Sequence, residues 1–165
     1  MPENTFAQIL SDVSKFAESA NDLALLQTFI VEIIAQHLHY YNWTGFYMLD
    51  PDDSETLILE AFRGAPTEHV CIPVSQGICG AAVAQNDTVI LDDVNSDPRY
   101  LSCSLETKSE IVVPIRANGE VVGEIDIDSH DVAAFSSRDK VFLEECAVIV
   151  GRFIEQTHAV SSEAK

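Results

Sequence analysis

The chain has 165 residues, 47% hydrophobic and 22% charged, so it can bury a substantial core and does not have the composition of a disordered protein. Its 27 acidic and 9 basic residues give a formal net charge of −18, which argues against nucleic acids and anionic membranes as partners, because both are bound by clustered Lys and Arg. Residues 1–15 lack the pattern of a signal peptide, and no apolar run approaches the roughly 18–20 residues of a transmembrane helix. We therefore expect a soluble, cytoplasmic protein that forms one domain over residues 1–165.

The N-terminal part of the chain, about residues 5–40, has the composition and spacing of two helices. The first covers residues 5–20. Asn21 and Asp22 then offer an N-cap for a longer helix, whose apolar residues from Leu23 to Leu38 recur every three or four positions. This spacing predicts a helix that buries one broad face.

Residues 43–130 alternate between extended segments and turns. The segments with strand character are residues 43–49, 56–62, 69–74, 88–91, 111–116 and 120–128. The last two flank Asn118-Gly119, a dipeptide typical of a tight hairpin, and a turn-rich stretch joins the first two. Residues 78–84, rich in small side chains, are predicted to form a short helix, and residues 92–105 a long polar loop.

A final helix is predicted over about residues 136–157, and the segment from Ser136 to Asp139 resembles a capping box at its start. Helices at both ends with hairpins between them indicate the α+β class. We expect a mostly antiparallel sheet on which the N- and C-terminal helices pack.

Three carboxylates on the strand predicted over residues 120–128 form the most informative charge pattern. Because side chains alternate between the two faces of a strand, Glu124, Asp126 and Asp128 share one face. Neighbouring carboxylates repel one another unless solvent, a cation or protonation relieves the repulsion. This face is either solvated, the commoner case for antiparallel strands, or part of a pocket for an ammonium group in which one acid stays protonated.

The cysteines are too sparse for a disulfide scaffold and form no CxxC motif; they are Cys71, Cys79, Cys103 and Cys146. No metal site is expected, because zinc ligands normally come as closely spaced pairs. The one close histidine pair, His37 and His39, lies in an apolar helical stretch. Cys146 lies among apolar helix residues and is predicted to be a core residue.

Cys79 and Cys103 are the two thiols with a functional interpretation. Cys79 lies at the predicted start of a helix, where the helix dipole lowers the pKa of a thiol. Cys103 lies in the long loop, where greater exposure is expected. The two can exchange through a disulfide only if the fold brings them together, and their spacing does not decide this.

Trp43 and His69 are also candidate functional residues. Trp43 is either a core aromatic residue or an apolar wall for a small substrate group. His69 lies two positions before Cys71 and is therefore expected on the same face of a strand.

Four groups of residues, taken in order, form a recognisable series. They are residues 42–47 (NWTGFY), 72–74 with 77–80 (IPV and GICG), 106–114 (ETKSEIVVP) and 123–129 (GEIDIDS). The series resembles the free methionine-(R)-sulfoxide reductases, a family of single GAF domains, and covers nearly the whole chain. The resemblance implies a central antiparallel sheet of about six strands and reduction of the free amino acid, not of the protein-bound residue.

The resemblance also implies a role for particular residues. Cys103 corresponds to the nucleophile that attacks the sulfoxide sulfur and becomes a sulfenic acid, which a second cysteine condenses to a disulfide that thioredoxin reduces. Glu110, Asp126 and Asp128 correspond to substrate-binding carboxylates, and Trp43 to the residue that contacts the substrate's methyl group. Acids suit this chemistry, because a sulfoxide oxygen leaves only once protonated and an ammonium group needs an anionic partner. No cofactor is implied, and the family suggests homodimers.

Two positions depart from the family's pattern. His69 occupies the place of the first cysteine of three-cysteine members, which makes Cys79 the expected resolving thiol and Cys71 a further candidate; the roles of Cys79 and Cys103 can also be reversed. Glu124 replaces an aliphatic residue and adds a negative charge.

Two non-catalytic functions stay open as alternatives. One is a GAF module that senses a small molecule, which the missing first cysteine and Glu124 favour and the lack of an attached signalling segment opposes. The other is a redox switch that uses Cys79 and Cys103 without a substrate.

Overall fold

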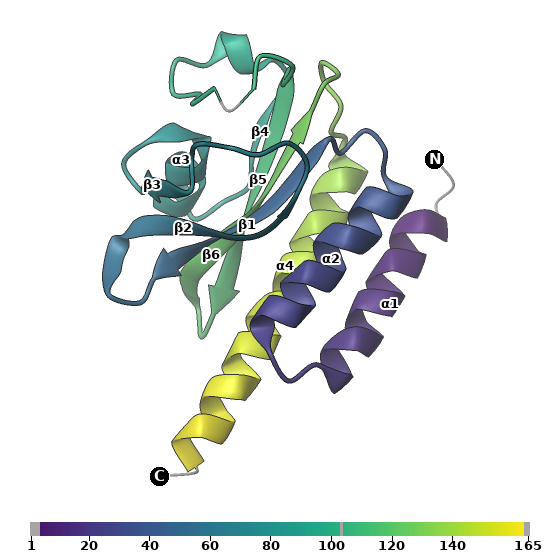
Figure 1. Cartoon of the computed structure of the whole chain (residues 1–165), viewed down its shortest axis with the longest axis vertical. Helices are drawn as coiled ribbons and strands as arrows, with labels where there is room; N and C mark the ends of the chain where they lie inside the picture. The colour runs from purple at the N-terminus through teal and green to yellow at the C-terminus, as the bar shows by residue number, and fades with distance from the viewer. Residues whose placement is uncertain (1–3, 103, 164–165) are drawn as a thin grey trace.

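The computed structural model of the chain describes residues 4–102 and 104–163 (Figure 1). A six-stranded antiparallel sheet forms its centre, with the strand order β3-β2-β1-β6-β5-β4. Its strands are β1 Trp43–Asp50, β2 Asp53–Arg63, β3 Cys71–Pro73, β4 Val89–Leu91, β5 Ser109–Ala117 and β6 Glu120–Ser129. The α+β class and the six predicted strands are confirmed, including the hairpin at Asn118-Gly119 and the turn that joins β1 to β2.

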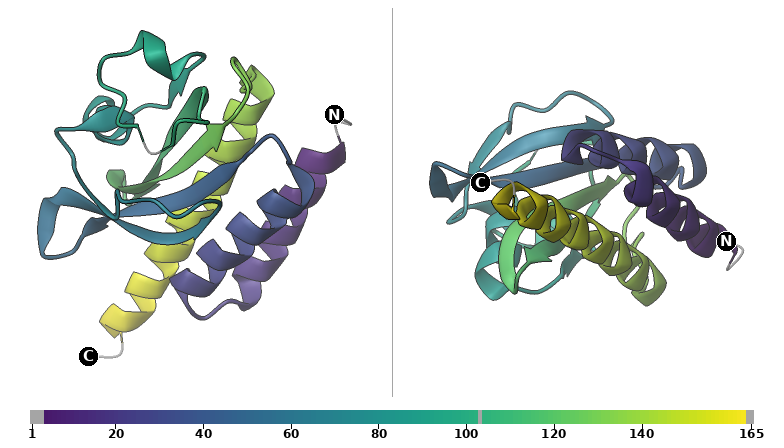
Figure 2. Two further views of the ribbon diagram at one scale, coloured as in Figure 1. Left: turned by 45° about the horizontal axis from the view of Figure 1, so that its top comes forward. Right: turned by 90° about the horizontal axis from the view of Figure 1, so that it is seen from below.

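Three of the four helices lie on one face of the sheet: α1 Asn4–Ser19, α2 Leu23–His37 and α4 Ser137–Glu163 (Figures 1 and 2). Helix α4 contacts β5, α2 contacts β2 and β1, and α1 packs on the other two helices. The fourth helix, α3 Gly77–Gln85, lies on the opposite face and contacts β3, β5 and β6. The sheet is therefore covered unevenly, by a layer of long helices on one side and by one short helix and loops on the other.

Both predicted helix starts are confirmed by their capping contacts. The Asp22 carboxylate accepts a hydrogen bond from the backbone N–H of Ala24 at 2.9 Å. At the start of α4 the Asp139 carboxylate accepts from the backbone N–H of Ser136 at 2.8 Å. The predicted end of this helix near residue 157 is wrong, because α4 continues to Glu163. Its last turns extend beyond the sheet (Figure 1), so no apolar spacing toward the strands indicates the end of the helix in the sequence.

Each face of the sheet has its own apolar core. The larger core lies under α1, α2 and α4 and contains Cys146, as predicted. The smaller one lies under α3 and contains Trp43, Tyr47, Cys79 and Val112. The long loop between β4 and β5 holds a short 3-10 turn, Val94–Ser96, where no regular element was predicted. In the described part of the chain, no helix is long and apolar enough to cross a membrane.

Candidate functional site

The candidate site lies on the sheet face that α3 covers, where three neighbouring strands place their side chains in rows. In one row Asp128 of β6 is paired with Trp43 of β1 and Glu110 of β5. In the next row Asp126 is paired with Gly45 and Val112. Because side chains two residues apart on a strand share a face, Glu124 follows in a third row, beside Tyr47 and Pro114. The sheet thus gathers four carboxyl groups from residues distant in sequence.

All four acids are buried, which shows that the solvated-face interpretation of β6 is wrong. Glu110, Asp126 and Asp128 are 6%, 4% and 5% exposed, and Glu124 is 0% exposed. Helix α3 and the loop after β4 cover this face, and strand alternation alone cannot reveal such a cover. Asp139, at the start of α4, is a further buried acid and is 4% exposed.

Burial sets the protonation state of the cluster. It raises the pKa of Glu110 and Asp128 well above the usual range, and the negative charge of Asp126 raises both further. Burial also raises the pKa of Asp126 and, to about 8, that of Glu124. At neutral pH the cluster therefore holds protons, so it can donate a hydrogen bond to an oxygen, and a bound cation pairs with an acid that gives up its proton.

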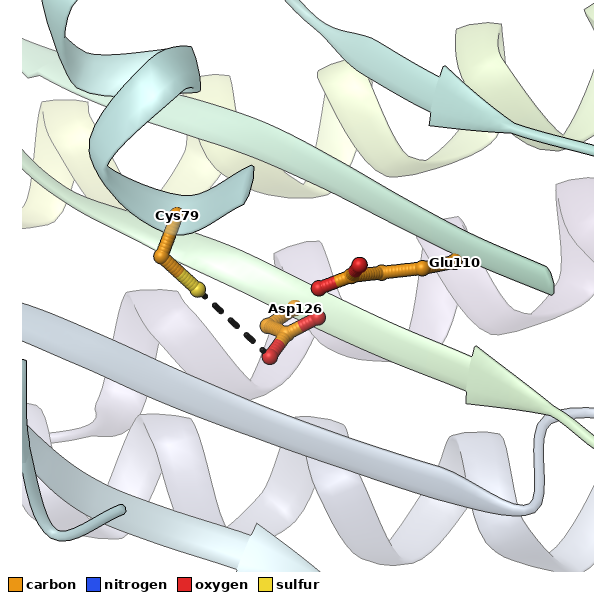
Figure 3. A group of neighbouring side chains, drawn as sticks. All are labelled: Cys79, Glu110 and Asp126. Atoms are coloured by element: carbon orange, nitrogen blue, oxygen red, sulfur yellow. Dashed lines mark hydrogen bonds between the residues drawn. The ribbon is translucent and has the colours of Figure 1, made fainter. Parts of the chain in front are cut away.

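Cys79 points from α3 toward β6, as Figure 3 shows, with its Sγ 3.7 Å from Oδ2 of Asp126. Its position in the first turn of α3 is as predicted. The predicted lowering of its pKa is wrong: burial raises the pKa of this thiol, and the charges of Glu124 and Asp126 raise it further. Burial and the acids of the neighbouring strands act against the helix dipole, and neither is visible in the local sequence around Cys79.

Trp43 forms part of the wall of a small cavity next to these acids. Its indole N–H donates to the backbone oxygen of Ala65 at 3.0 Å. The ring lies over Gly45, because a Cβ there would come within 2.2 Å of the indole Cη2. The cavity has a volume of about 80 Å³, and its lining includes Trp43, Ser104, Thr107 and Asp128. A larger groove of about 560 Å³ between α1 and α4 is lined by none of the four buried acids.

Cys103, the predicted nucleophile, lies outside the described residues, but residues on both sides of it border the site. Leu101 lies against the start of α3, where its Cδ1 would be 3.0 Å from a Cβ at Gly77. Ser104 lines the cavity. The imidazole Nε2 of His69 lies 3.2 Å from the backbone oxygen of Ser102.

The two candidate resolving thiols have different surroundings. Cys79 is buried against the acid cluster, whereas Cys71 is exposed on the edge strand β3. His69 precedes β3, so the expectation that His69 and Cys71 share one strand face is wrong. In the described residues, the acid cluster thus brings together Trp43, Glu110, Asp126, Asp128 and Cys79 without Cys71.

Comparison with known proteins identifies the family of this chain. The sequence pattern that defines the GAF domain family matches residues 3–154. The chain belongs to the GAF domain family. A relative in Escherichia coli, the free methionine-R-sulfoxide reductase, is 32% identical to it over 151 residues. This match covers 92% of the chain and 84% of the relative. The chain is 43% identical over 112 residues to the reductase of that name from Saccharomyces cerevisiae, a match that covers 67% of the chain and only 62% of the yeast protein.

A solved structure extends this similarity to almost the whole GAF domain. The free methionine-R-sulfoxide reductase of Neisseria meningitidis in complex with its substrate superposes with a TM-score of 0.89 at 28% identity. The superposition covers 97% of this chain and 95% of that protein. The expected GAF fold is therefore confirmed, and relatives in sequence and in structure are oxidoreductases.

Three donor atoms of this GAF domain lie close enough to share a cation. One atom each from Cys79, Glu110 and Asp126 lies within 4.8 Å of the others, and all three residues are buried. The sequence argument against a metal site considered only closely spaced ligand pairs, and these residues come from α3, β5 and β6. A thiol with two carboxyl groups can hold a divalent cation, but it can equally hold the ammonium group of an amino acid.

Two further residues belong to the site. Thr107 lines the cavity, and its hydrogen bond lowers the pKa of Asp128 against the effect of burial. Glu124 was predicted to share a strand face with Asp126 and Asp128 and was noted as a departure from the family's pattern, and it is the most buried acid of the cluster. Its position on the same strand face as Asp126 was the sequence signal for this placement.

Proposed function

We infer that this GAF domain reduces free methionine-(R)-sulfoxide to methionine. The observation that carries this proposal is the convergence of Glu110, Asp126 and Asp128 with Trp43 on one sheet face, beside a cavity that Asp128 and Trp43 line. Carboxyl groups bind the ammonium end of an amino acid, and an indole face suits its methyl-sulfur end. The names of the relatives from Escherichia coli and Neisseria meningitidis support the same substrate.

In the first step we assign the nucleophile to Cys103. Its sulfur attacks the sulfoxide sulfur while a protonated carboxyl group of the cluster donates a hydrogen bond and then its proton to the oxygen. With the thiol proton the oxygen leaves as water, so the sulfur–oxygen bond of the substrate breaks and a sulfonium joined to Cys103 by a sulfur–sulfur bond remains. A water molecule then attacks the Cys103 sulfur, the sulfur–sulfur bond breaks, and the proton that this water releases returns to the carboxyl group. Methionine leaves with its sulfur reduced by two electrons, and the cysteine is left oxidised as a sulfenic acid. The raised pKa of Glu110 suits it to be the proton donor at neutral pH.

In the second step Cys79 condenses with the sulfenic acid to form a disulfide and water, and thioredoxin reduces the disulfide. Cys79 is preferred to Cys71 because its helix borders Leu101, two residues before Cys103, whereas Cys71 is exposed at the far edge of the sheet. Thioredoxin-linked turnover fits a cytoplasmic location, and a homodimer is the assembly that the family implies.

The test is an assay of purified protein with dithiothreitol and each of the two sulfoxide epimers. We expect loss of the free (R)-sulfoxide and none of the (S) form. Cys103→Ser is expected to abolish turnover, while Cys71→Ser, matched in chemistry but placed on an exposed strand, retains it. Full activity of Cys103→Ser contradicts the assigned nucleophile. Binding of the (R)-sulfoxide without turnover contradicts the enzyme and indicates a sensor.

A further inference from the structure

The thiol of Cys79 lies in surroundings that oppose its reaction as a nucleophile. Only a thiolate attacks sulfur efficiently, yet burial and the neighbouring acids hold the pKa of Cys79 well above its usual range. A thiol of this kind reacts when a base takes its proton during the attack. The structure must therefore offer a proton acceptor within reach of Cys79 if this cysteine is the resolving thiol.

Glu124 is placed to be that acceptor. It lies on the same face of β6 as Asp126, and α3, which carries Cys79, packs on this strand. Neither carboxyl oxygen of Glu124 makes a hydrogen bond of ordinary geometry with the described residues, although both are buried. Its two neighbours in the same row of the sheet have no such bond with it: the side chain of Pro114 has no polar atom, and the Tyr47 hydroxyl donates to the backbone oxygen of His69 at 2.6 Å.

We propose that Glu124 is the general base of Cys79. As the Cys79 sulfur attacks the sulfenic sulfur of Cys103, the S–H bond breaks and its proton passes to the Glu124 carboxylate. The sulfur–sulfur bond forms with the electron pair of Cys79, and the sulfenic oxygen leaves as hydroxide, which a protonated acid of the cluster converts to water. Cys79 is oxidised, the sulfenic sulfur is reduced, and no further reactant is needed.

Asp126 is the competing acceptor, since its Oδ2 lies 3.7 Å from the Cys79 sulfur. This carboxyl group also interacts with Glu110 and is one of the acids proposed to bind the substrate. Glu124 is not assigned to substrate binding, because it lies two rows along β6 from Asp128, the acid that lines the cavity. We therefore assign substrate binding to Asp126 and proton transfer to Glu124.

The titratable groups around Glu124 come from each element packed against it. They are Cys79 of α3, Asp126 on its own strand, Glu110 of β5 and Tyr47 of β1. Burial raises the pKa of Glu124 to about 8, and its interaction with the Cys79 thiol acts in the opposite direction. The rate of the disulfide step should therefore rise with pH through this region, as Glu124 becomes ionised.

The inference rests on the thiol chemistry of the proposed function but is tested without methionine sulfoxide. The experiment uses full-length Cys71→Ser protein, in which one equivalent of hydrogen peroxide converts the reactive thiol to a sulfenic acid. Formation of the Cys79–Cys103 disulfide is then followed between pH 6 and 10 by thiol titration and peptide mapping. We expect Glu124→Gln to slow this step about a hundredfold at pH 8 and to remove the rise near that pH. Glu124→Asp is expected to restore part of the rate, and Glu120→Gln, at the exposed start of the same strand, to leave it unchanged.

Each other outcome overturns the assignment of Glu124. An unchanged rate and pH profile in Glu124→Gln, a loss confined to Asp126→Asn, or wild-type protein that forms no disulfide through Cys79 would each do so. If the disulfide forms as expected while the dithiothreitol assay shows no sulfoxide reduction, the proposed substrate is wrong and the role of Glu124 stands.

Discussion

The imidazole of His69 and the backbone oxygen of Ser102 form a contact of 3.2 Å between two loops that are distant in sequence. His69 is itself held in place, since its backbone oxygen accepts a hydrogen bond from Tyr47 and its backbone N–H donates to Thr67. Ser102 directly precedes the proposed nucleophile. His69 thus connects the segment that carries this nucleophile to a buried tyrosine of the sheet.

We expect His69→Ala to loosen the loop without unfolding the domain. Loss of one hydrogen bond costs about 1 kcal/mol, which corresponds to roughly fivefold faster hydrogen exchange of the amides near residues 100–106. Turnover with dithiothreitol should fall as well. His69→Gln, which keeps a donor, should exchange more slowly than His69→Ala, and His39→Ala on the exposed surface should behave as wild type. Unchanged exchange in His69→Ala would show that this contact does not order the loop.

Trp43 and Gly45 depend on each other, because the indole occupies the space that a side chain at position 45 would need. A Cβ at Gly45 would lie 2.2 Å from the ring, so Gly45→Ala should displace the indole and destabilise the protein by about 1–3 kcal/mol. The KM for the sulfoxide should rise, and the emission of this single tryptophan should shift to the red. In the double variant Trp43→Ala/Gly45→Ala the two costs should be less than additive; strict additivity would contradict the close contact.

The buried acids should make the protein less stable as the pH rises. The pKa of Glu124 is raised from 4.5 in the unfolded chain to about 8 in the folded one, so below pH 4.5 both states hold the proton. Between these values only the folded state holds it, and the free energy of unfolding falls by up to about 1.4 kcal/mol per pH unit for this group. Glu110, Asp126 and Asp128 act in the same direction.

Urea unfolding at pH 5, 6, 7 and 8 measures this effect. Wild type should show a decreasing free energy of unfolding, and Glu124→Gln a shallower decrease. A free energy that rises over this range, or an equal slope in the two proteins, would show that Glu124 is not held protonated by the fold.

Glu110→Gln should separate stability from activity. The substitution removes one ionisable group from a buried cluster of like charges, so we expect a higher Tm. It also removes the group assigned as the proton donor of the first step, so kcat/KM should fall at least tenfold. Glu68→Gln, at an exposed loop position, should change neither quantity. A variant that loses both stability and activity would contradict this explanation.

Local patterns in the sequence were enough to predict the elements of this fold. The apolar spacing of α2, the capping residues Asp22 and Ser136, and Asn118-Gly119 between β5 and β6 each specify structure within a few residues. The burial of Glu124, in contrast, depends on α3 crossing over strands that are distant in the chain. Strand alternation is the same whether a face meets water or a helix, so the sequence pattern could not decide between them.

The chemistry of Cys79 was unpredictable for the same reason. A position in the first turn of a helix is a local property, and it indicated a lowered pKa. Burial under the packed sheet raises the pKa most, and the acids that raise it further come from β5 and β6, whose distance from Cys79 depends on how the sheet and α3 pack. The family resemblance predicted that Glu110, Asp126 and Asp128 act together, because residues of one site correspond between relatives even when they are distant in sequence. It left the role of Glu124 open.

Because the sheet is covered unevenly, its two faces contribute differently to stability and to chemistry. The face under the three long helices holds most of the apolar residues that drive folding, and the face under α3 holds acids that oppose it. Substitutions should therefore differ in their effect: changes of apolar residues under the long helices should reduce the amount of folded protein, whereas changes of the acids beneath α3 should leave abundant protein with altered chemistry. The apolar packing on one side stabilises the fold enough to offset the cost of burying the acids on the other side.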